Sequence, residues 1–281
     1  MSSARPLIMG ILNVTPDSFS DGGAYNRVDA AVEHAAAMIA QGADIIDVGG
    51  ESTRPGAQRI DAELEQARVL PVIRELASMG ARVSIDTMNA STADAAASLG
   101  IDIINDVSAG TADHNMPRVV AALGLTFVAM HSRGASDARV VYTDVVADVC
   151  RDLAASVRML TAEGVDPELV VLDPGLGFAK SAVESWRLVG AIDELVALGH
   201  RVLIGASRKR FLAQLLPPSA SVTDRDLPTA IVTALAADAG AWCVRVHDIA
   251  GSKVALDVWA AARGTAAVQT DAADRARRGA A

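Results

Sequence analysis

The sequence predicts a fold of the α/β class, a single (β/α)8 barrel of the TIM type. Short runs rich in Val, Ile and Leu alternate with longer stretches of helical periodicity, and eight such pairs lie between residues 7 and 263. The runs are apolar throughout instead of alternating with polar residues, which is typical of parallel strands covered on both faces. The alternative is a doubly wound sheet, but the G-x-G-x-x-G loop of its nucleotide-binding members does not occur in this chain.

The strands and helices follow one another in strict order. The predicted strands cover residues 7–12, 44–48, 82–85, 102–104, 125–129, 169–172, 201–205 and 242–246. The predicted helices cover residues 28–40, 62–79, 91–99, 116–123, 142–163, 182–198, 209–215 with 229–239, and 251–263. Glycines stand between several helices and the next strand, where a left-handed residue ends a helix: Gly42, Gly80, Gly100, Gly199 and Gly240.

The domain organisation predicted from this order is one barrel over residues 1–264. Residues 265–281 consist of polar and small residues without apolar periodicity, and we expect them to form a disordered tail. With no stretch of 18 apolar residues and no long apolar N-terminal segment, we expect neither a membrane span nor a signal peptide.

Composition narrows the class of protein further. The chain is 51% hydrophobic, which argues against disorder as its main state. A net charge of −9 argues against a general nucleic-acid binder, although a local cationic cluster can still hold an anionic small molecule. The two cysteines, Cys150 and Cys243, have no C-x-x-C spacing, which favours a reducing, cytoplasmic location.

Polar residues follow every predicted strand, at the barrel end where active sites of this fold lie. Taken singly, an Asp or Asn there is more often a helix cap than a catalyst, and His131 is predicted to be a structural histidine. The set as a whole points to a site, because all eight strands end in polar residues and the first loop, residues 13–27, is longer than packing requires. Charges on the predicted helices are interpreted as solvated: Glu33, Glu63, Glu65 and Asp94.

The residue types at these strand ends predict a ligand with two different halves. Asp86, Asn105 and Asp173 are expected deep in the barrel, where carboxylates and a carboxamide suit a planar heterocycle with amino and ring N–H donors. Cationic side chains are expected nearer the rim, where they suit phosphate or carboxylate oxygens: Arg54, Lys209, Arg245 and His247. Asn13 offers an oxygen to a Mg²⁺ ion held mainly by diphosphate.

Seven segments together resemble the dihydropteroate synthases, the folate-pathway enzymes that sulfonamides inhibit. They occur in family order at residues 13–23, 47–56, 84–87, 104–107, 173–180, 205–209 and 245–248. The first two are long enough to be specific, and no motif position departs from the family pattern. The resemblance covers residues 7 to about 260 and implies a Mg²⁺-dependent transferase. That enzyme would join 6-hydroxymethyl-7,8-dihydropterin diphosphate to 4-aminobenzoate, giving 7,8-dihydropteroate and diphosphate.

The resemblance also implies roles for particular residues. The pterin would be held by Asp86, Asn105, Asp173 and Lys209. The diphosphate would be held by Asn13, Arg245 and His247, with Asn13 also a ligand of Mg²⁺. The aminobenzoate would be surrounded by Thr53, Arg54, Pro55, Phe178, Ser207 and Lys209. The catalytic set would be Asp21, Asp86, Lys209 and Arg245, with Asp21 helping to close the site. The family further implies a homodimer formed through helices away from the active face.

Three other functions remain as alternatives at this stage. A methyltetrahydrofolate methyltransferase would share the inward Asp and Asn residues, but it has no use for a diphosphate clamp. An inactive paralogue would bind pterin without turnover, and intact loop segments argue against it. A non-catalytic assembly protein has no specific support in the sequence.

Overall fold

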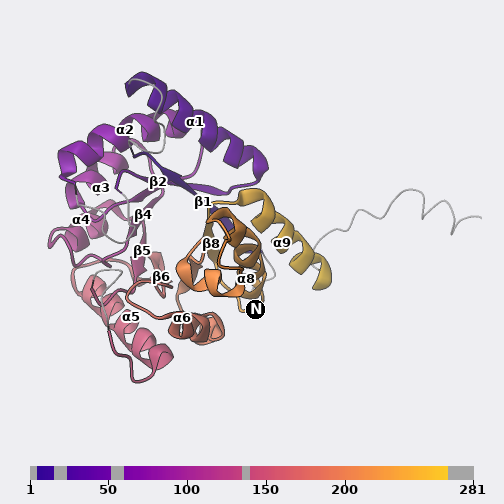
Figure 1. Ribbon diagram of the computed structural model, residues 1–281. Coiled ribbons are helices and arrows are strands. Elements are labelled where there is room, and N and C mark those ends of the chain that lie inside the picture. The colour runs from indigo at the N-terminus through magenta and orange to yellow at the C-terminus, as the bar shows by residue number, and fades with distance from the viewer. Residues whose placement is uncertain (1–4, 16–23, 52–59, 135–139, 265–281) are drawn as a thin grey trace, which may run out of the picture.

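The computed structural model describes residues 5–15, 24–51, 60–134 and 140–264. Over these ranges the chain forms a closed barrel of parallel strands in sequence order, with β8 paired to β1 (Figure 1). The strands are β1 (Leu7–Asn13), β2 (Ile45–Gly49), β3 (Val83–Asp86), β4 (Ile103–Asp106), β5 (Thr126–Met130), β6 (Val170–Asp173), β7 (Arg201–Ile204) and β8 (Cys243–Val246). The predicted (β/α)8 barrel is confirmed.

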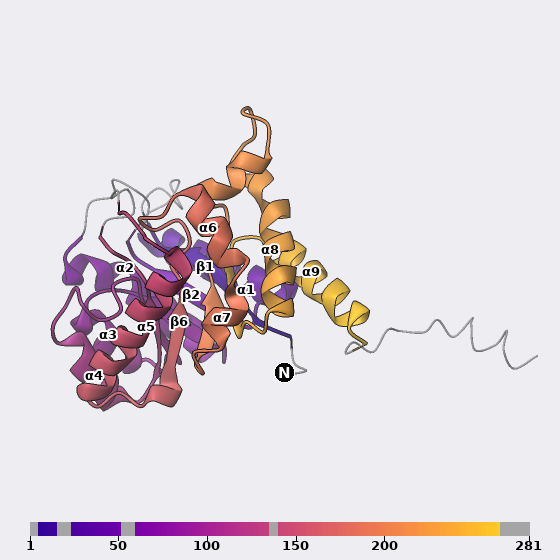
Figure 2. The ribbon, with the colours of Figure 1, turned by 90° about the horizontal axis from the view of Figure 1, so that it is seen from below.

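Helices surround the barrel as an outer ring. The α-helices are α1 (Ala24–Gln41), α2 (Ala62–Ser78), α3 (Ala90–Ala97), α4 (Met116–Leu123), α5 (Val145–Ala162), α6 (Ala182–Val189), α7 (Ile192–Val196), α8 (Asp226–Asp238) and α9 (Ile249–Ala262). Three short 3-10 helices are η2 (Pro167–Leu169), η3 (Arg210–Leu215) and η4 (Thr223–Arg225). Figure 2 shows the orange segment that precedes α8 projecting beyond this ring. No helix among these described residues is long and apolar enough to cross a bilayer.

Two predicted helices differ from the structure. The stretch 182–198 is divided into α6 and α7 because Gly190 ends α6, as expected for a residue of low helix propensity. Residues 210–215 form only 3-10 turns, and α8 begins at Asp226 instead of residue 229. Pro228 lies in the first turn of α8, where the missing N–H costs no helical hydrogen bond. The predicted disordered tail, residues 265–281, lies outside the described residues.

Apolar side chains close the inside of the barrel. Seven strands each contribute one fully buried side chain to a single cluster: Met9, Ile45, Ile103, Val128, Val171, Leu203 and Cys243. A larger core lies between the strands and the helices. Because the cluster fills the interior in the manner of a layered barrel, the polar residues that end the strands lie beyond it.

The parallel register brings the predicted polar residues side by side at the carboxyl ends. Asn13 pairs with Gly49, Gly49 with Asp86, and Asp86 with Asn105. Adjacent strands lie about 4.8 Å apart, so these residues from four consecutive strands share one edge of the barrel. Asp173 ends β6 on the same face.

Candidate active site

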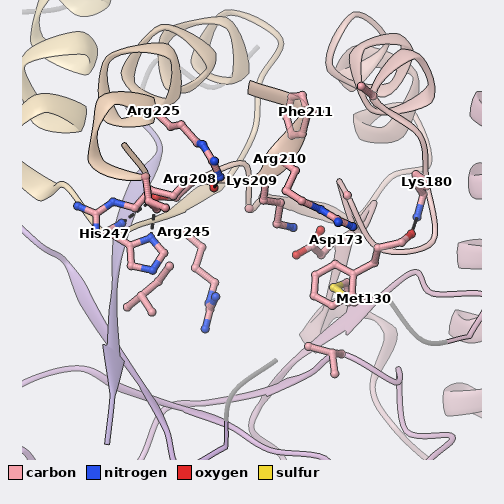
Figure 3. Close-up of a pocket in the computed structure, with 18 of the residues that line it drawn as sticks. Met130, Asp173, Lys180, Arg208, Lys209, Arg210, Phe211, Arg225, Arg245 and His247 are labelled. Atoms are coloured by element: carbon pink, nitrogen blue, oxygen red, sulfur yellow. Dashed lines mark hydrogen bonds between the residues drawn. The ribbon is translucent and has the colours of Figure 1, made fainter. Parts of the chain in front are cut away.

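A cavity of about 1010 Å³ opens at the carboxyl ends of the strands (Figure 3). Nine of the predicted site residues line it: Asn13, Asp86, Asn105, Asp173, Phe178, Ser207, Lys209, Arg245 and His247. The structure therefore brings together every predicted site residue that it describes. Asp21, Thr53, Arg54 and Pro55 lie outside the described residues.

Asp173 and Lys209 face each other across Gly205 (Figure 3). A Cβ atom on Gly205 would lie 3.6 Å from Asp173 Oδ2 and 3.9 Å from Lys209 Nζ, so both groups lie at van der Waals distance from this position. Asp173 Oδ1 accepts the Gly175 N–H at 2.7 Å, which fixes the carboxylate. Burial raises the pKa of Asp173, and burial lowers the pKa of Lys209 to about 8 despite the attraction of Asp173. The cavity is therefore lined by the fixed carboxylate acceptor of Asp173 and by a Lys209 amine that holds its proton less tightly than an ordinary lysine.

Arg245 lies between two carboxylates in the floor, and this corrects its predicted place nearer the rim. Its Nε donates to Asp47 Oδ2 at 2.6 Å, and its second terminal nitrogen donates to Asp86 Oδ2 at 2.7 Å. Burial alone would lower the pKa of Arg245, but Asp47 and Asp86 raise it. Burial also raises the pKa of Asp86 to about 7, although Arg245 opposes the shift. The residue spacing gives no sign that Arg245 reaches inward, because its partner Asp47 lies 198 positions away in the chain.

Asp47 is a site residue that the sequence analysis missed. It is fully buried, and Oδ2 accepts from Asn105 Nδ2 at 3.1 Å as well as from Arg245. Its signal in the sequence is a charged residue inside the apolar run 44–48, where burial demands a partner. Asp47 therefore orients both the Asn105 amide and the Arg245 guanidinium.

Ser207 and His247 join the ends of β7 and β8. The Ser207 hydroxyl oxygen accepts the main-chain N–H of His247 at 3.1 Å, and it lies 2.9 Å from His247 Nδ1. The hydroxyl proton can therefore donate to Nδ1, which leaves the ring proton on Nε2. Such an imidazole offers an N–H donor to an anion without being protonated.

The two other cations of the 207–210 segment have different environments. Arg208 has a left-handed backbone, with φ of 57°, and its guanidinium makes two hydrogen bonds to Asp226 at 2.7 and 2.8 Å. Its carbonyl accepts from Arg225 at 2.9 Å. Arg208 therefore anchors this segment to the start of α8, and Arg210 is exposed at the mouth of the cavity.

Phe178 forms one wall of the cavity on the turn after β6. Lys209 Nζ lies 4.6 Å from the centre of the Phe178 ring, which is cation–π distance. The turn requires glycine at residue 175, where φ is +64° and a Cβ atom would lie 2.0 Å from the His131 carbonyl oxygen. An apolar ring beside a cation suits an aromatic carboxylate.

Glu65 is not a solvated charge, and this corrects its interpretation from helical periodicity. It is 1% exposed and accepts from Thr87 Oγ1 at 2.8 Å and from Asn89 Nδ2 at 2.9 Å. These bonds tie α2 to the end of β3 and compensate the burial of the charge. The interpretation is confirmed for the other three, since Glu33, Glu63 and Asp94 are exposed.

The chain matches one family model, that of the pterin binding enzymes, over residues 9–247. Dihydropteroate synthase of Mycobacterium leprae is 51% identical to it over 92% of this chain and 94% of that protein. The chain belongs to the dihydropteroate synthase family. Dihydropteroate synthases are transferases, and so is this enzyme.

Solved dihydropteroate synthases have the same fold. The Xanthomonas albilineans enzyme with 4-aminobenzoic acid matches at a TM-score of 0.87 and 40% identity, covering 94% of this chain and 95% of that one. The same organism's enzyme in complex with 7,8-dihydropteroate matches at a TM-score of 0.84 and 37% identity, with the same coverage.

The oxygen donors near Asn13 fit a magnesium ion. Asn13 lines the cavity, and its Oδ1 would lie 3.7 Å from a Cβ atom on Gly49 of the neighbouring strand. Hard carboxamide and carboxylate oxygens suit Mg²⁺, which commonly takes most of its other ligands from water and substrate phosphates. Within the described part of the chain, no group of three or more His, Cys, Asp or Glu could hold a metal alone.

Proposed function

We propose that this enzyme joins 6-hydroxymethyl-7,8-dihydropterin diphosphate to 4-aminobenzoate, forming 7,8-dihydropteroate and diphosphate. The observation that carries the proposal is one cavity lined by an acidic and amide floor and, beside it, by cations and an aromatic wall. The X. albilineans relatives with 4-aminobenzoic acid and with 7,8-dihydropteroate support this second substrate and this product.

The pterin would bind against the floor. Asp173 and Asp86 present carboxylate oxygens to its amino and ring N–H groups, and Asn105 can pair with a ring amide. Lys209 supplies a donor to the ring carbonyl or a ring nitrogen while staying beside Asp173. Because each of these groups is already held by a neighbour, little ordering is needed on binding.

The diphosphate would lie across the ends of β1 and β8. Asn13 would hold Mg²⁺, and His247 and Arg245 would hold diphosphate oxygens as N–H donors. When bound, Mg²⁺ supplies Lewis-acid neutralisation of the charge on the leaving oxygens. Arg245 would serve both halves of the ligand from its position between Asp47 and Asp86.

The aminobenzoate would stack against Phe178, with Ser207 and Lys209 around it. Thr53, Arg54 and Pro55 would complete this subsite, and Asp21 would help to close it; these four roles come from the family pattern alone. Closure would exclude water, which otherwise captures the electrophile.

The chemistry is a substitution at the pterin methylene carbon. The bond from this carbon to the diphosphate oxygen breaks, and its electron pair leaves with diphosphate. Asp86 stabilises the cationic character that develops on the pterin, and the aniline nitrogen forms the new bond and then loses a proton to solvent. Arg245 and Lys209 complement the departing charge. No residue forms a covalent intermediate, so catalysis rests on positioning and electrostatics.

We also propose that the enzyme is a homodimer in the cytoplasm. An aliphatic patch supports the dimer: α8 and α9 pack together and expose Leu227, Ile231, Leu235, Val254 and Val258. Such a contiguous apolar face commonly marks a protein interface. Two free cysteines, Cys150 and Cys243, support a reducing compartment.

The deciding experiment measures diphosphate release from the pterin diphosphate with and without 4-aminobenzoate, and with and without Mg²⁺. We expect release coupled to dihydropteroate formation and lost on chelation. Tight pterin binding without turnover would instead support a pterin methyltransferase or an inactive paralogue.

A further inference from the structure

Lys180 lines the cavity, yet none of the roles above uses it. Its Nζ lies 3.0 Å from His131 Nδ1, 3.1 Å from the Gly175 carbonyl oxygen and 3.1 Å from the Phe178 carbonyl oxygen. An ammonium group has three N–H donors, and three short contacts occupy them all. Figure 3 shows the Lys180 amine beside this main chain and apart from Lys209. Lys180 is therefore turned to the protein and not to a ligand.

The two carbonyls that Lys180 holds belong to the first and last residues of one tight turn. The Phe178 N–H donates to the Gly175 carbonyl oxygen at 3.0 Å and closes the turn. The next residue, Ala179, has φ of 47°, a left-handed conformation that is disfavoured for a residue with a Cβ atom. A turn followed directly by such a residue needs contacts that hold it, and Lys180 supplies them.

The third contact connects the turn to the outer helix α5. His131 Nδ1 accepts from Lys180, so its ring proton lies on Nε2 and donates to Asp152 Oδ2 at 3.2 Å. Asp152 Oδ2 also accepts from Arg133 Nε at 2.6 Å. The His131 main-chain N–H donates to the Asp173 carbonyl oxygen at 2.8 Å, which joins the ends of β5 and β6. Lys180 is thus held in place by a series of hydrogen bonds that runs through His131 to Asp152.

The contacts of Lys180 determine the position of Phe178, which forms one wall of the cavity. The Phe178 ring faces Lys209 Nζ at 4.6 Å, and a Cβ atom on Gly177 would come within 3.3 Å of Lys209 Cδ. A shift of the turn would move the ring and disturb the Lys209 stem together.

We propose that Lys180 is a positioning residue that holds the turn after β6 and thereby sets Phe178 as the wall of the aminobenzoate subsite. The inference rests on the proposed function, because it takes Phe178 to contact the aminobenzoate. It predicts that loss of Lys180 weakens binding of the second substrate more than binding of the pterin, although the pterin partners Asp173 and Lys209 adjoin the same turn.

The charge of Lys180 provides a second readout. The groups that face it are His131, Arg133 and Tyr142 after β5, Asp173 and Glu184 near β6 and α6, and Lys209 after β7. Burial lowers the pKa of Lys180 to about 7. Above that pH the amine has only two N–H donors for three acceptors, so the hydrogen bonds that tie the turn to His131 are no longer all satisfied. The KM for aminobenzoate should therefore rise through about pH 7.

The test is the Lys180→Met variant, assayed at pH 6.5 and 8.5. At pH 6.5 we expect the KM for 4-aminobenzoate to rise about 10-fold, with kcat and the calorimetric Kd of the pterin diphosphate within about 3-fold of the parent. The rise of this KM near pH 7 should be absent from the variant. Lys253→Met is the matched control, because Lys253 forms an ion pair with Asp257 on α9, outside the cavity lining.

An unchanged KM in folded Lys180→Met would overturn the inference, as would an equal loss of pterin affinity. If that variant does not fold, Asp152→Ala decides, because Asp152 is a half-buried residue of α5 whose loss frees His131 and should raise the same KM about 3-fold. An unchanged KM there would then count against the inference. A parent enzyme that makes no dihydropteroate would refute the proposed function instead.

Discussion

Arg245 on β8 donates to the carboxylate of Asp47 on β2 at 2.6 Å, across the intervening end of β1. Asp47 is fully buried, and 19% of the Arg245 side chain is exposed. The ion pair therefore connects β8 to β2 in the floor of the cavity. Asp86 on β3 extends this network through its own ion pair with Arg245. A buried cation between two carboxylates compensates both, so the free energy of removing one partner depends on the others.

A double-mutant cycle tests this coupling. Arg245→Ala leaves two buried carboxylates without their cation, and we expect it to lower the free energy of unfolding by roughly 3 kcal/mol. Asp47→Ala should also destabilise, and the double variant should lose about 1–3 kcal/mol less than the sum of the singles. Urea unfolding at pH 7.5 measures all four proteins. Additive losses would show that the two residues act independently.

The Asp173→Asn variant should lose affinity for the pterin while it keeps the stability of the fold. The amide keeps an oxygen for the Gly175 N–H, but it removes the negative charge beside Lys209 and an acceptor for the pterin. Losing two charge-assisted hydrogen bonds at about 1.5 kcal/mol each should weaken pterin binding roughly 100-fold. Calorimetry with the pterin diphosphate measures the affinity, and thermal unfolding checks the fold. An unchanged Kd would remove Asp173 from the pterin site.

The barrel was predictable from sequence because it depends on local patterns. Each β strand is a short apolar run and most α helices have a clear period, so the order of elements follows directly. The strand-end residues Asp86, Asn105 and Asp173 were predictable for the same reason, because a parallel barrel gathers them at one face.

What the sequence did not show was which way the long or internal charged side chains turn. Arg245 reaches inward because a second carboxylate, that of Asp47, is buried inside the barrel. The spacing of residues along the sequence does not indicate that Arg245 and Asp47 form an ion pair. Glu65 shares the helical position of a solvated residue, yet its partners come from the loop after β3. Contacts between residues 22 to 198 positions apart cannot be read from local periodicity.

The pH dependence of kcat/KM for the pterin diphosphate should be bell-shaped. Burial raises the pKa of Asp86 to about 7, so its carboxylate becomes available as pH rises through that value. Burial lowers the pKa of Lys209 to about 8, so its cation is lost as pH rises further. Activity should therefore peak between pH 7 and 8. The residual activity of Lys209→Arg should still rise with pH through about 7, but it should no longer fall at alkaline pH. A parent enzyme whose kcat/KM stays constant from pH 6 to 9 would contradict the roles given to Asp86 and Lys209.

His131 should make the fold less stable in acid. Burial and the nearby Lys180 cation lower its folded pKa to about 4, against an ordinary value of 6.5. Between these values the unfolded chain binds the proton and the folded chain does not, so stability falls as pH decreases from 6.5 to 4. The full loss is roughly 3 kcal/mol. Urea unfolding of His131→Gln should show a shallower decline over this window, and parallel declines in parent and variant would exclude His131 as a cause.

The aliphatic patch on α8 and α9 makes the proposed dimer testable. Leu227, Ile231 and Leu235 recur every four residues on α8, with exposures of 71%, 56% and 50%, and Val254 and Val258 continue the patch on α9. Ile231→Glu would place a charge at the centre of an apolar contact, where its desolvation is unfavourable. We expect sedimentation to show a dimer for the parent and a monomer for Ile231→Glu. Met79→Glu, a matched exposed site at the end of α2, should remain dimeric. A parent that sediments as a monomer at micromolar concentration would leave this face without its proposed partner.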